Sequence, residues 1–442
     1  MATIVDVRDR YVAQFETLAR REAFGGPSWL GPVRRAAIAR FAERGWPTTR
    51  DEDWRYTNLA ALAAVSFRPA PDLEGTRLPA EVLERLAIGG RDWPRLVFVD
   101  GRYSARLSSV PLMPGGGRVI SLAEALTTDP GLLEAHLARD GSVFADLNTA
   151  FLQDGALVHL PAGARVERPI ELLFVATSPG VLAQPRTVIE AGPHSQVSVV
   201  ERYVGLTGEA YFTNTVTGIA AGPGATVNHY AVQEQGAEAF HVATIHASLQ
   251  RDSAVTACGV TFGGRLVRTT LAMTLAGPGA RGTLRGLYVI GGRQHVDNHV
   301  TVDHAVPRGS SRQLYKGVLD DQARAVFNGR ILVRPDAQKT DATQTNKHLL
   351  LSDGVEVDSK PQLEIFADDV KCTHGAAEGQ PAPEALFYLR SRGLEEATAR
   401  GLLTYGFARE VLEHVSIEPL RAHLDHVLTA RLRTEPVAKE TA

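Results

Sequence analysis

The hydrophobic pattern of the chain changes twice along its length. Near the N-terminus, apolar residues recur at helical spacing over Tyr11–Phe24 and again over Pro32–Phe41, and Gly45–Pro47 interrupts the pattern. From about residue 155 the chain becomes short alternating apolar runs separated by Gly and Pro turns, and after Gly379 the helical spacing returns. The pattern therefore predicts helical terminal parts around a strand-rich centre.

Two apolar runs meet at Asp100 and Gly101, within residues 95–107. An Asp-Gly pair between such runs is a strong signal for a tight turn, because both positions of that turn need a positive φ. We therefore expect a β-hairpin here.

The strand-rich centre repeats itself. A triplet that ends in Val recurs at intervals of 31, 30 and 28 residues, at Ala164–Val166, Ser195–Val197, Ala225–Val227 and Ser253–Val255. The tripeptide Ala-Gly-Pro also occurs three times, at 191–193, 221–223 and 276–278. One coil cannot bury its inward face alone, so a strand-like repeat of this length predicts stacked coils. We favour a β-solenoid over a β-sandwich, which has turns about every 8–12 residues, and over a propeller, whose repeat is about 40 residues or longer.

The C-terminal part, 382–432, predicts three helices, with breaks at Gly393 and at 416–419. Its apolar stripe at helical spacing consists of Leu402, Leu403, Phe407, Val411 and Leu412. Two interpretations remain open: the stripe caps the end of the solenoid, or it is a docking face for a partner. We expect three regions in all: a helical domain over 1–94, a β core over 95–379 and a helical domain over 380–442.

Composition narrows the class of protein. The chain has 442 residues, 44% of them hydrophobic and 22% charged, and a net charge of −3. This is ordinary for a globular protein, and the missing basic excess argues against a nucleic-acid or membrane partner. The two cysteines do not make a disulfide framework, the first residues contain no apolar signal segment, and no run of 18 apolar residues occurs. We therefore expect a cytoplasmic protein in a reducing compartment.

The strongest candidate for chemistry is the segment from Asp368 to His374. If it is a strand, Asp368, Val370, Cys372 and His374 share one face, because side chains alternate. A thiol and an imidazole on one face can ligate a metal or a cluster edge, or form a thiolate–imidazolium pair. The alternative is a small buried cysteine beside a hydrogen-bonded histidine.

Three histidines and the other cysteine form a weaker candidate. His295 and His299 would share one strand face and His304 the other, which suits a common metal poorly, so we expect solvent-facing or turn histidines. Cys258 is expected to be a small buried residue on a strand. An iron–sulfur cluster usually takes about four protein ligands, mostly thiolates. Two cysteines 114 positions apart cannot supply them, so any cluster would need His, acid or partner ligands.

Several segments resemble one family. Asp51–Leu59, Asn346–Ser352, Pro361–Ala376 and Leu386–Gly393 are similar to the SufB/SufD family of iron–sulfur cluster assembly proteins. Asn346 stands where SufB-type members usually carry a cysteine, and the Cys-Thr-His-Gly-Ala reading from Cys372 also favours the SufD branch.

The resemblance implies a mainly β protein, with a right-handed parallel β-helix core between helical terminal domains. It implies a non-catalytic scaffold that pairs with a SufB-type paralogue and holds a nascent iron–sulfur cluster transiently at that interface. His374 would be a ligand or interface residue, with Cys372 as a weaker candidate. We expect no stable cofactor in the isolated chain and, without a dinucleotide fingerprint, no flavin site. The chain could also form a homodimer when alone.

The C-terminal helices are implied to bind a SufC-type ABC ATPase, through candidate docking residues Phe387, Tyr388, Arg390, Arg392, Leu402 and Phe407. Two other classes compete with this interpretation. One is a β-helix polysaccharide lyase or hydrolase that uses Asp368 and Asp369. The other is an ABC transporter permease, which the missing spanning segment argues against.

Overall fold

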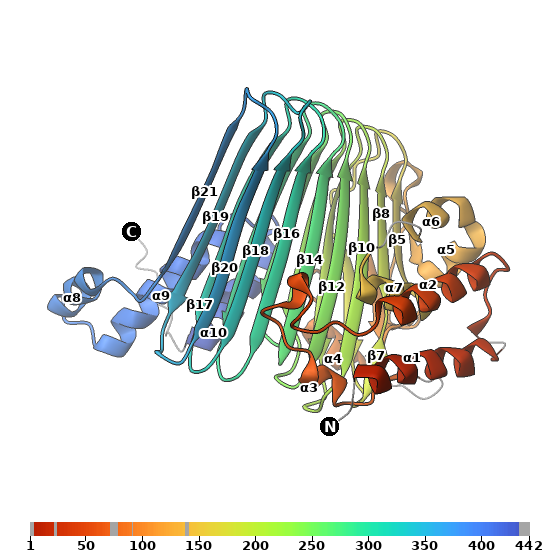
Figure 1. Cartoon of the computed structure of the whole chain (residues 1–442), viewed down its shortest axis with the longest axis horizontal. Coiled ribbons are helices and arrows are strands. Elements are labelled where there is room, and N and C mark those ends of the chain that lie inside the picture. The colour runs from red at the N-terminus through yellow and green to blue at the C-terminus, as the bar shows by residue number, and fades with distance from the viewer. Residues whose placement is uncertain (1–3, 22–23, 71–77, 91, 138–140, 433–442) are drawn as a thin grey trace.

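The computed structural model describes residues 4–21, 24–70, 78–90, 92–137 and 141–432. Its centre is a solenoid of long parallel strands, and helices lie along its sides and at both ends (Figure 1).

The solenoid consists of two sheets, and from β8 onward successive strands alternate between them. Sheet A runs in the order β20 (Glu356–Ile365), β18 (Arg324–Val333), β16 (His295–His304), β14 (Leu266–Leu275), β12 (Phe240–Leu249), β10 (Phe212–Ala221), β8 (Arg186–Ala191), β5 (Gly155–Leu160) and β4 (Arg118–Ser121), with β1 (Arg68–Pro69) and β7 (Val181–Ala183) beside this row. Sheet B runs in the order β21 (Lys371–Gly379), β19 (Asp341–Leu350), β17 (Ser310–Leu319), β15 (Arg281–Ile290), β13 (Ala254–Thr261), β11 (Thr226–Glu234), β9 (Gln196–Gly205), β6 (Ile170–Ala176), β2 (Arg95–Val99) and β3 (Arg102–Tyr103). The predicted parallel β-helix is confirmed.

Stacking of the coils explains the sequence repeat. Val197, Val227 and Val255 are partners in register on three neighbouring strands and lie in one apolar core inside the solenoid. The Ala-Gly-Pro tripeptides lie at the turns, where neighbouring coils approach closely. A Cβ on Gly192 would come 2.7 Å from the carbonyl oxygen of Leu160, and one on Gly277 would come 1.9 Å from a backbone nitrogen. Glycine is therefore required where the coils touch.

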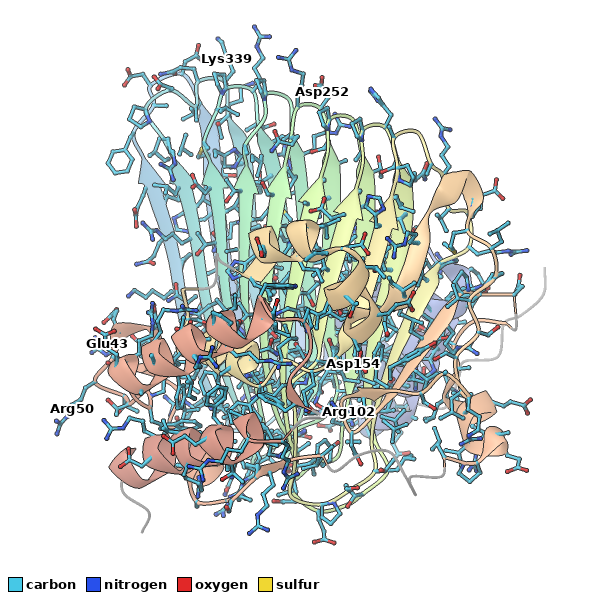
Figure 2. All side chains as sticks on the ribbon, turned by 90° about the vertical axis from the view of Figure 1, so that its right-hand side faces the viewer. Glu43, Arg50, Arg102, Asp154, Asp252 and Lys339 are labelled. Carbon is cyan, nitrogen blue, oxygen red and sulfur yellow. The ribbon has the colours of Figure 1, made fainter. Side chains whose placement is uncertain are left out.

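Other turns use left-handed residues that are not glycine. Asp252 (φ 56°) and Lys339 (φ 64°) have this conformation, and Figure 2 shows both on the same rim of the solenoid. Asp tolerates positive φ better than most residues, whereas Lys at such a position is uncommon.

The first end of the solenoid is closed. The predicted hairpin at Asp100 and Gly101 is confirmed, and it turns β3 antiparallel to β2. On the other sheet, β4 runs antiparallel to β5. Helices α5 (Leu122–Thr128) and α6 (Pro130–Leu137) pack here in a cluster that includes Leu157 and Val188, and Pro114–Gly116 forms a short 3-10 turn, η3.

The N-terminal helices pack against sheet A. They are α1 (Ile4–Ala19), α2 (Leu30–Arg44), the 3-10 turn η2 (Glu52–Trp54) and α3 (Ala60–Ala63), and the buried helix α7 (Val143–Ala150) lies between α2 and sheet A. Helix α4 (Ala80–Leu86) instead packs on sheet B, in a cluster that includes Val97 and Leu173. The predicted break at Gly45 is confirmed, because its φ of 73° ends α2. Phe67 joins these helices to the solenoid through the rings of Phe212 and Phe240.

The three predicted C-terminal helices are confirmed as α8 (Pro383–Ser391), α9 (Glu396–Leu412) and α10 (Glu418–Leu432), with Gly393 at a φ of 92°. Helices α9 and α10 pack on the outer face of sheet B, where Val411, Leu412 and Leu424 are buried. The interpretation of this stripe as an end cap is therefore wrong. Figure 1 shows α8 projecting beyond the end formed by β21. None of the described helices is long and apolar enough to cross a membrane.

Candidate functional site

The last coil leaves two strands without a second neighbour. Within the described part of the chain, β20 pairs with β18 and β21 pairs with β19, and both sheets end there. We call the end formed by β20 and β21 the open end. An edge of this length is a template on which another strand can pair.

The two edge strands differ as templates. The N–H of Lys371 donates to the carbonyl of Thr340 at 2.8 Å. The backbone N–H and C=O groups of the odd-numbered β21 residues therefore point toward β19, and those of the even-numbered residues point away from it. On β20, Glu356 and Phe366 donate toward β18, so Pro361 occupies an outward position. Proline there interrupts the outward donors of β20 without breaking the ladder to β18. Strand β21 contains no proline and offers an unbroken row.

The candidate ligands lie on β21. Cys372 is the register partner of Ala342 and His374 that of Gln344, so both side chains continue interior columns of the solenoid. Cys372 is half-buried beside an apolar cluster that includes Ile331, and His374 is exposed. The prediction that these two residues share a face is confirmed.

The prediction that Asp368 shares this face is wrong. The strand begins at Lys371, and Asp368 and Asp369 form the turn before it. Asp369 forms an ion pair with Lys339 in the neighbouring turn.

Burial raises the pKa of the Cys372 thiol, although a hydrogen bond from the backbone of Ala342 opposes this. The thiol is therefore protonated at neutral pH, which contradicts a thiolate–imidazolium pair with a lowered Cys pKa in the free chain. A metal that binds Cys372 must displace this proton. Among the described residues, no group of three or more His, Cys, Asp or Glu side chains is arranged to hold a metal ion.

The other cysteine and the three histidines lie elsewhere. Cys258 is a buried residue on β13, as predicted, and burial raises its pKa to about 12. All three histidines lie on strand β16 rather than in turns, and none is exposed, so the prediction of solvent-facing or turn histidines is wrong. Their division between two faces is confirmed: His295 and His299 flank Asp297 on the outer face, and His304 is buried inside.

The outer group on β16 anchors the N-terminal segment. Thr57 donates to Asp297 at 2.6 Å, and Arg268 forms an ion pair with the same carboxylate. The Arg268 guanidinium lies 3.7 Å from the centre of the Trp54 ring. Sequence reasoning missed this cluster. A signal was present in the sequence: Trp54 lies within a charged stretch, and a large aromatic ring there needs a surface of another element to pack on.

Comparison with known proteins identifies the family. Residues 174–407 match the model described as SUF system FeS cluster assembly, SufBD core domain, and residues 6–172 match the SufBD protein N-terminal region. The chain belongs to the SufBD family.

Similar SufBD proteins match over most of their length. The chain is 33% identical to an iron–sulfur cluster assembly SufBD family protein of Synechocystis, covering 87% of each chain. It is 31% identical to the iron–sulfur cluster assembly protein SufD of Escherichia coli, over 88% of this chain and 90% of that one. It is 27% identical to SufD of Bacillus subtilis, over 98% and 100%.

The SufBD core match includes α8, whose surface differs from that of α9. Phe387 is 75% exposed and Tyr388 is 57% exposed, and Arg390 and Arg392 are also exposed. The other two candidate docking residues, Leu402 and Phe407, lie on α9 and are half-buried. Phe407 packs toward sheet B, where the Lys316 ammonium lies 4.2 Å from its ring centre.

Proposed function

We propose that this chain is a non-catalytic scaffold subunit for iron–sulfur cluster assembly, and that its open end forms the assembly surface with a SufB-type paralogue. The observation that carries the proposal is that both candidate ligands, Cys372 and His374, lie on the edge strand β21 of a SufBD family chain, which pairs with β19 on one side only within the described residues. A partner strand that pairs with β21 would come next to both side chains.

The cluster would be transient cargo rather than a resident cofactor. A cluster needs about four ligands, and this chain has two cysteines, of which Cys258 is buried under the C-terminal helices. Of the candidate ligands, the open end contributes His374 and Cys372, and we propose that the partner supplies the thiolates that this chain lacks. Because Cys372 must remain a free thiol for this role, we propose that the protein acts in the reducing cytoplasm.

The region 380–442 is proposed as the docking unit for a SufC-type ATPase. Two large exposed side chains on α8, Phe387 and Tyr388, with the cations of Arg390 and Arg392 beside them, make a small surface of the type that anchors protein interfaces.

Helix α9 provides a physical link from that docking unit to the open end. The buried ammonium of Lys316 on β17 donates to the carbonyl of Phe407 at 2.9 Å and forms an ion pair with Glu410. Strand β17 is next but one to β21 in sheet B. We propose that dimerisation of the ATPase upon ATP binding displaces α9, and that this displacement reaches the open end through Lys316.

Co-expression with SufB-type and SufC-type subunits tests the proposal. We expect a complex that accumulates iron and sulfide. We expect His374→Ala to lower the cluster yield while the complex of subunits stays intact. Thr373→Ala is the matched control, because Thr373 faces the opposite side of the same strand. Equal cluster yields from both variants would remove the role given to His374, and failure to co-purify would remove the proposed partners.

A further inference from the structure

The interior of the solenoid becomes polar beneath the open end. Gln313 on β17 and Gln344 on β19 are register partners, and His374 of β21 continues their column. Asn346 lies beneath Ala376 in the next interior column. The side chains of Gln313, Gln344 and Asn346 are at most 3% exposed.

The side chains reach across the interior toward sheet A. The Nδ2 atom of Asn346 donates to Ser359 on β20 at 2.8 Å. The amide of Gln344 lies over Gly329 on β18, where an added Cβ would come 2.0 Å from Nε2. The polar groups therefore lie between the two sheets, inside the last coils.

Several of these buried atoms have no hydrogen-bond partner among the described residues. They are both amide atoms of Gln313, both of Gln344, Oδ1 of Asn346 and Nδ1 of His348. Buried polar atoms in native proteins are nearly always satisfied by protein or by ordered water. Six such atoms in neighbouring columns indicate a shared ligand rather than separate defects.

A third column contributes His348. Strand β17, between β15 and β19, carries Gly317 in this column, and a Cβ there would come 2.2 Å from the ring of Tyr288 and 2.8 Å from the ring of His348. Glycine therefore lets the two rings meet, with 2.5 Å between the Tyr288 hydroxyl and Nε2 of His348. On its other side, Nδ1 of His348 lies 3.8 Å from Oε1 of Glu378 on β21. A water can bridge polar atoms at that separation.

The polar side chains of these three columns determine which kind of ligand fits between them. The amides supply both donors and acceptors, and burial lowers the pKa of His348 to about 4, so its ring is neutral at neutral pH. A cation would leave the amide N–H donors unpaired, and an anion would leave the amide oxygens unpaired. A small neutral molecule that both donates and accepts fits the set, and water has this property.

We propose that the last coils enclose a polar well, lined by Gln313, Gln344, Asn346 and His348, that holds ordered water and opens at the open end beside Glu378. The open end is then hydrated from its inner side, whichever partner covers it. This inference rests on the interior of the chain alone and not on the proposed assembly function.

A crystal structure of the full chain tests the well directly. We expect ordered water within about 2.7–3.2 Å of the Gln313, Gln344 and Asn346 amides. An interior without such water would overturn the proposal.

Variants at Gln344 test it in solution. Gln344→Leu and Gln344→Met remove the amide but keep an apolar side chain of similar size. In a hydrated well both variants displace water and strand the remaining amides, so the melting temperature falls. In a dry interior both variants remove an unsatisfied buried group, so it rises. Thr345→Val on the same strand, whose side chain faces outward, is the control and should change little. A rise for both Gln344 variants would overturn the proposal. If neither folds, the crystal structure decides.

Discussion

The hydroxyl of Thr57 lies 2.6 Å from Oδ2 of Asp297, a residue 240 positions later in the chain. Asp297 is 1% exposed, and it also forms an ion pair with Arg268, whose guanidinium covers the ring of Trp54. One buried carboxylate thus fastens the N-terminal segment to β16 and, through Arg268, to β14. The segment cannot leave the solenoid without exposing or unpairing these charges.

Asp297→Asn should therefore destabilise the protein strongly. The asparagine can still accept from Thr57, but Arg268 is left buried without its counter-charge. Breaking a buried pair by removing one partner costs about 3–5 kcal/mol. Urea unfolding measures this as a lower midpoint.

Glu52→Gln is the matched control for this prediction. Glu52 belongs to the same N-terminal segment and forms an exposed ion pair with Lys360 on β20 at 2.6 Å. Solvent screens an exposed pair, so this pair should contribute little to stability. A loss for Asp297→Asn no larger than that of Glu52→Gln would show that the buried pair does not hold the segment.

Stability should fall as the pH drops from neutral toward 4. Burial lowers the pKa of His241, His295 and His304 from 6.5 to about 4. Between these values the unfolded chain binds protons that the folded chain does not, so protonation favours unfolding. For each histidine, a tenfold difference in proton affinity between the unfolded and folded chains corresponds to about 1.4 kcal/mol of stability.

Asp297 extends the loss of stability to lower pH. Burial alone would raise the pKa of this carboxyl, but Arg268, His299 and Thr57 outweigh burial and hold the pKa well below its usual range. Its stabilising contribution is complete above the unfolded pKa and is lost as the pH falls below that value. Unfolding midpoints measured from pH 7 to pH 3 check both effects. His241→Gln should flatten the upper part of the profile, and a wild-type profile without slope there would contradict the assignment.

The sequence predicted those features that depend on neighbours one coil away. The Val triplets and the Ala-Gly-Pro turns repeat because Val197, Val227 and Val255 stack in register on neighbouring coils. The period of this repeat was therefore enough to predict the solenoid. Alternation along one strand likewise placed Cys372 and His374 on one face. These are local rules, and a sequence can show them.

Features that depend on distant partners could not be predicted. An apolar stripe does not tell which surface it covers, so α9 was compatible with the end of the solenoid as well as with the face of sheet B. His295 was expected in solvent because its partner, Thr57, comes from a distant segment of the chain. The boundary between turn and strand at Lys371 also escaped prediction, since Asp368 and Asp369 fit either one.

The exposed aromatic residues of α8 should matter for binding and not for folding. Phe387→Ala with Tyr388→Ala removes side chains that are 75% and 57% exposed, so the melting temperature of the isolated chain should barely change. Affinity for a SufC-type ATPase should fall at least about tenfold. A tenfold loss corresponds to about 1.4 kcal/mol of binding free energy, which the loss of a single hot-spot side chain can cost. Titration calorimetry with the purified ATPase measures it.

Glu384→Gln, in the first turn of the same exposed helix, is a suitable control for that double variant. The proposed docking site would be refuted if the control and the double variant bound the ATPase equally well. A lowered melting temperature of the double variant would instead mean that α8 packs on the chain and is not a free surface.

Strand pairing at the open end can be tested with one proline. The N–H groups of even-numbered β21 residues point away from β19, so Ala376→Pro should remove an outward donor and leave the β19 ladder intact. We expect the isolated chain to keep most of its stability, because proline is tolerated on edge strands in that position, as Pro361 is on β20. Pairing with a SufB-type partner should be lost or greatly weakened, and size-exclusion chromatography of the mixed proteins measures this.

Ala377→Pro provides the reverse case one residue along the strand. Its N–H faces β19, so proline here removes a ladder hydrogen bond and should destabilise the isolated chain. The two variants add the same side chain to neighbouring alanines and differ mainly in which side of β21 loses its donor. If Ala376→Pro still pairs normally with the partner, main-chain pairing on β21 does not form the interface, and the candidate ligands Cys372 and His374 must meet the partner through side chains alone.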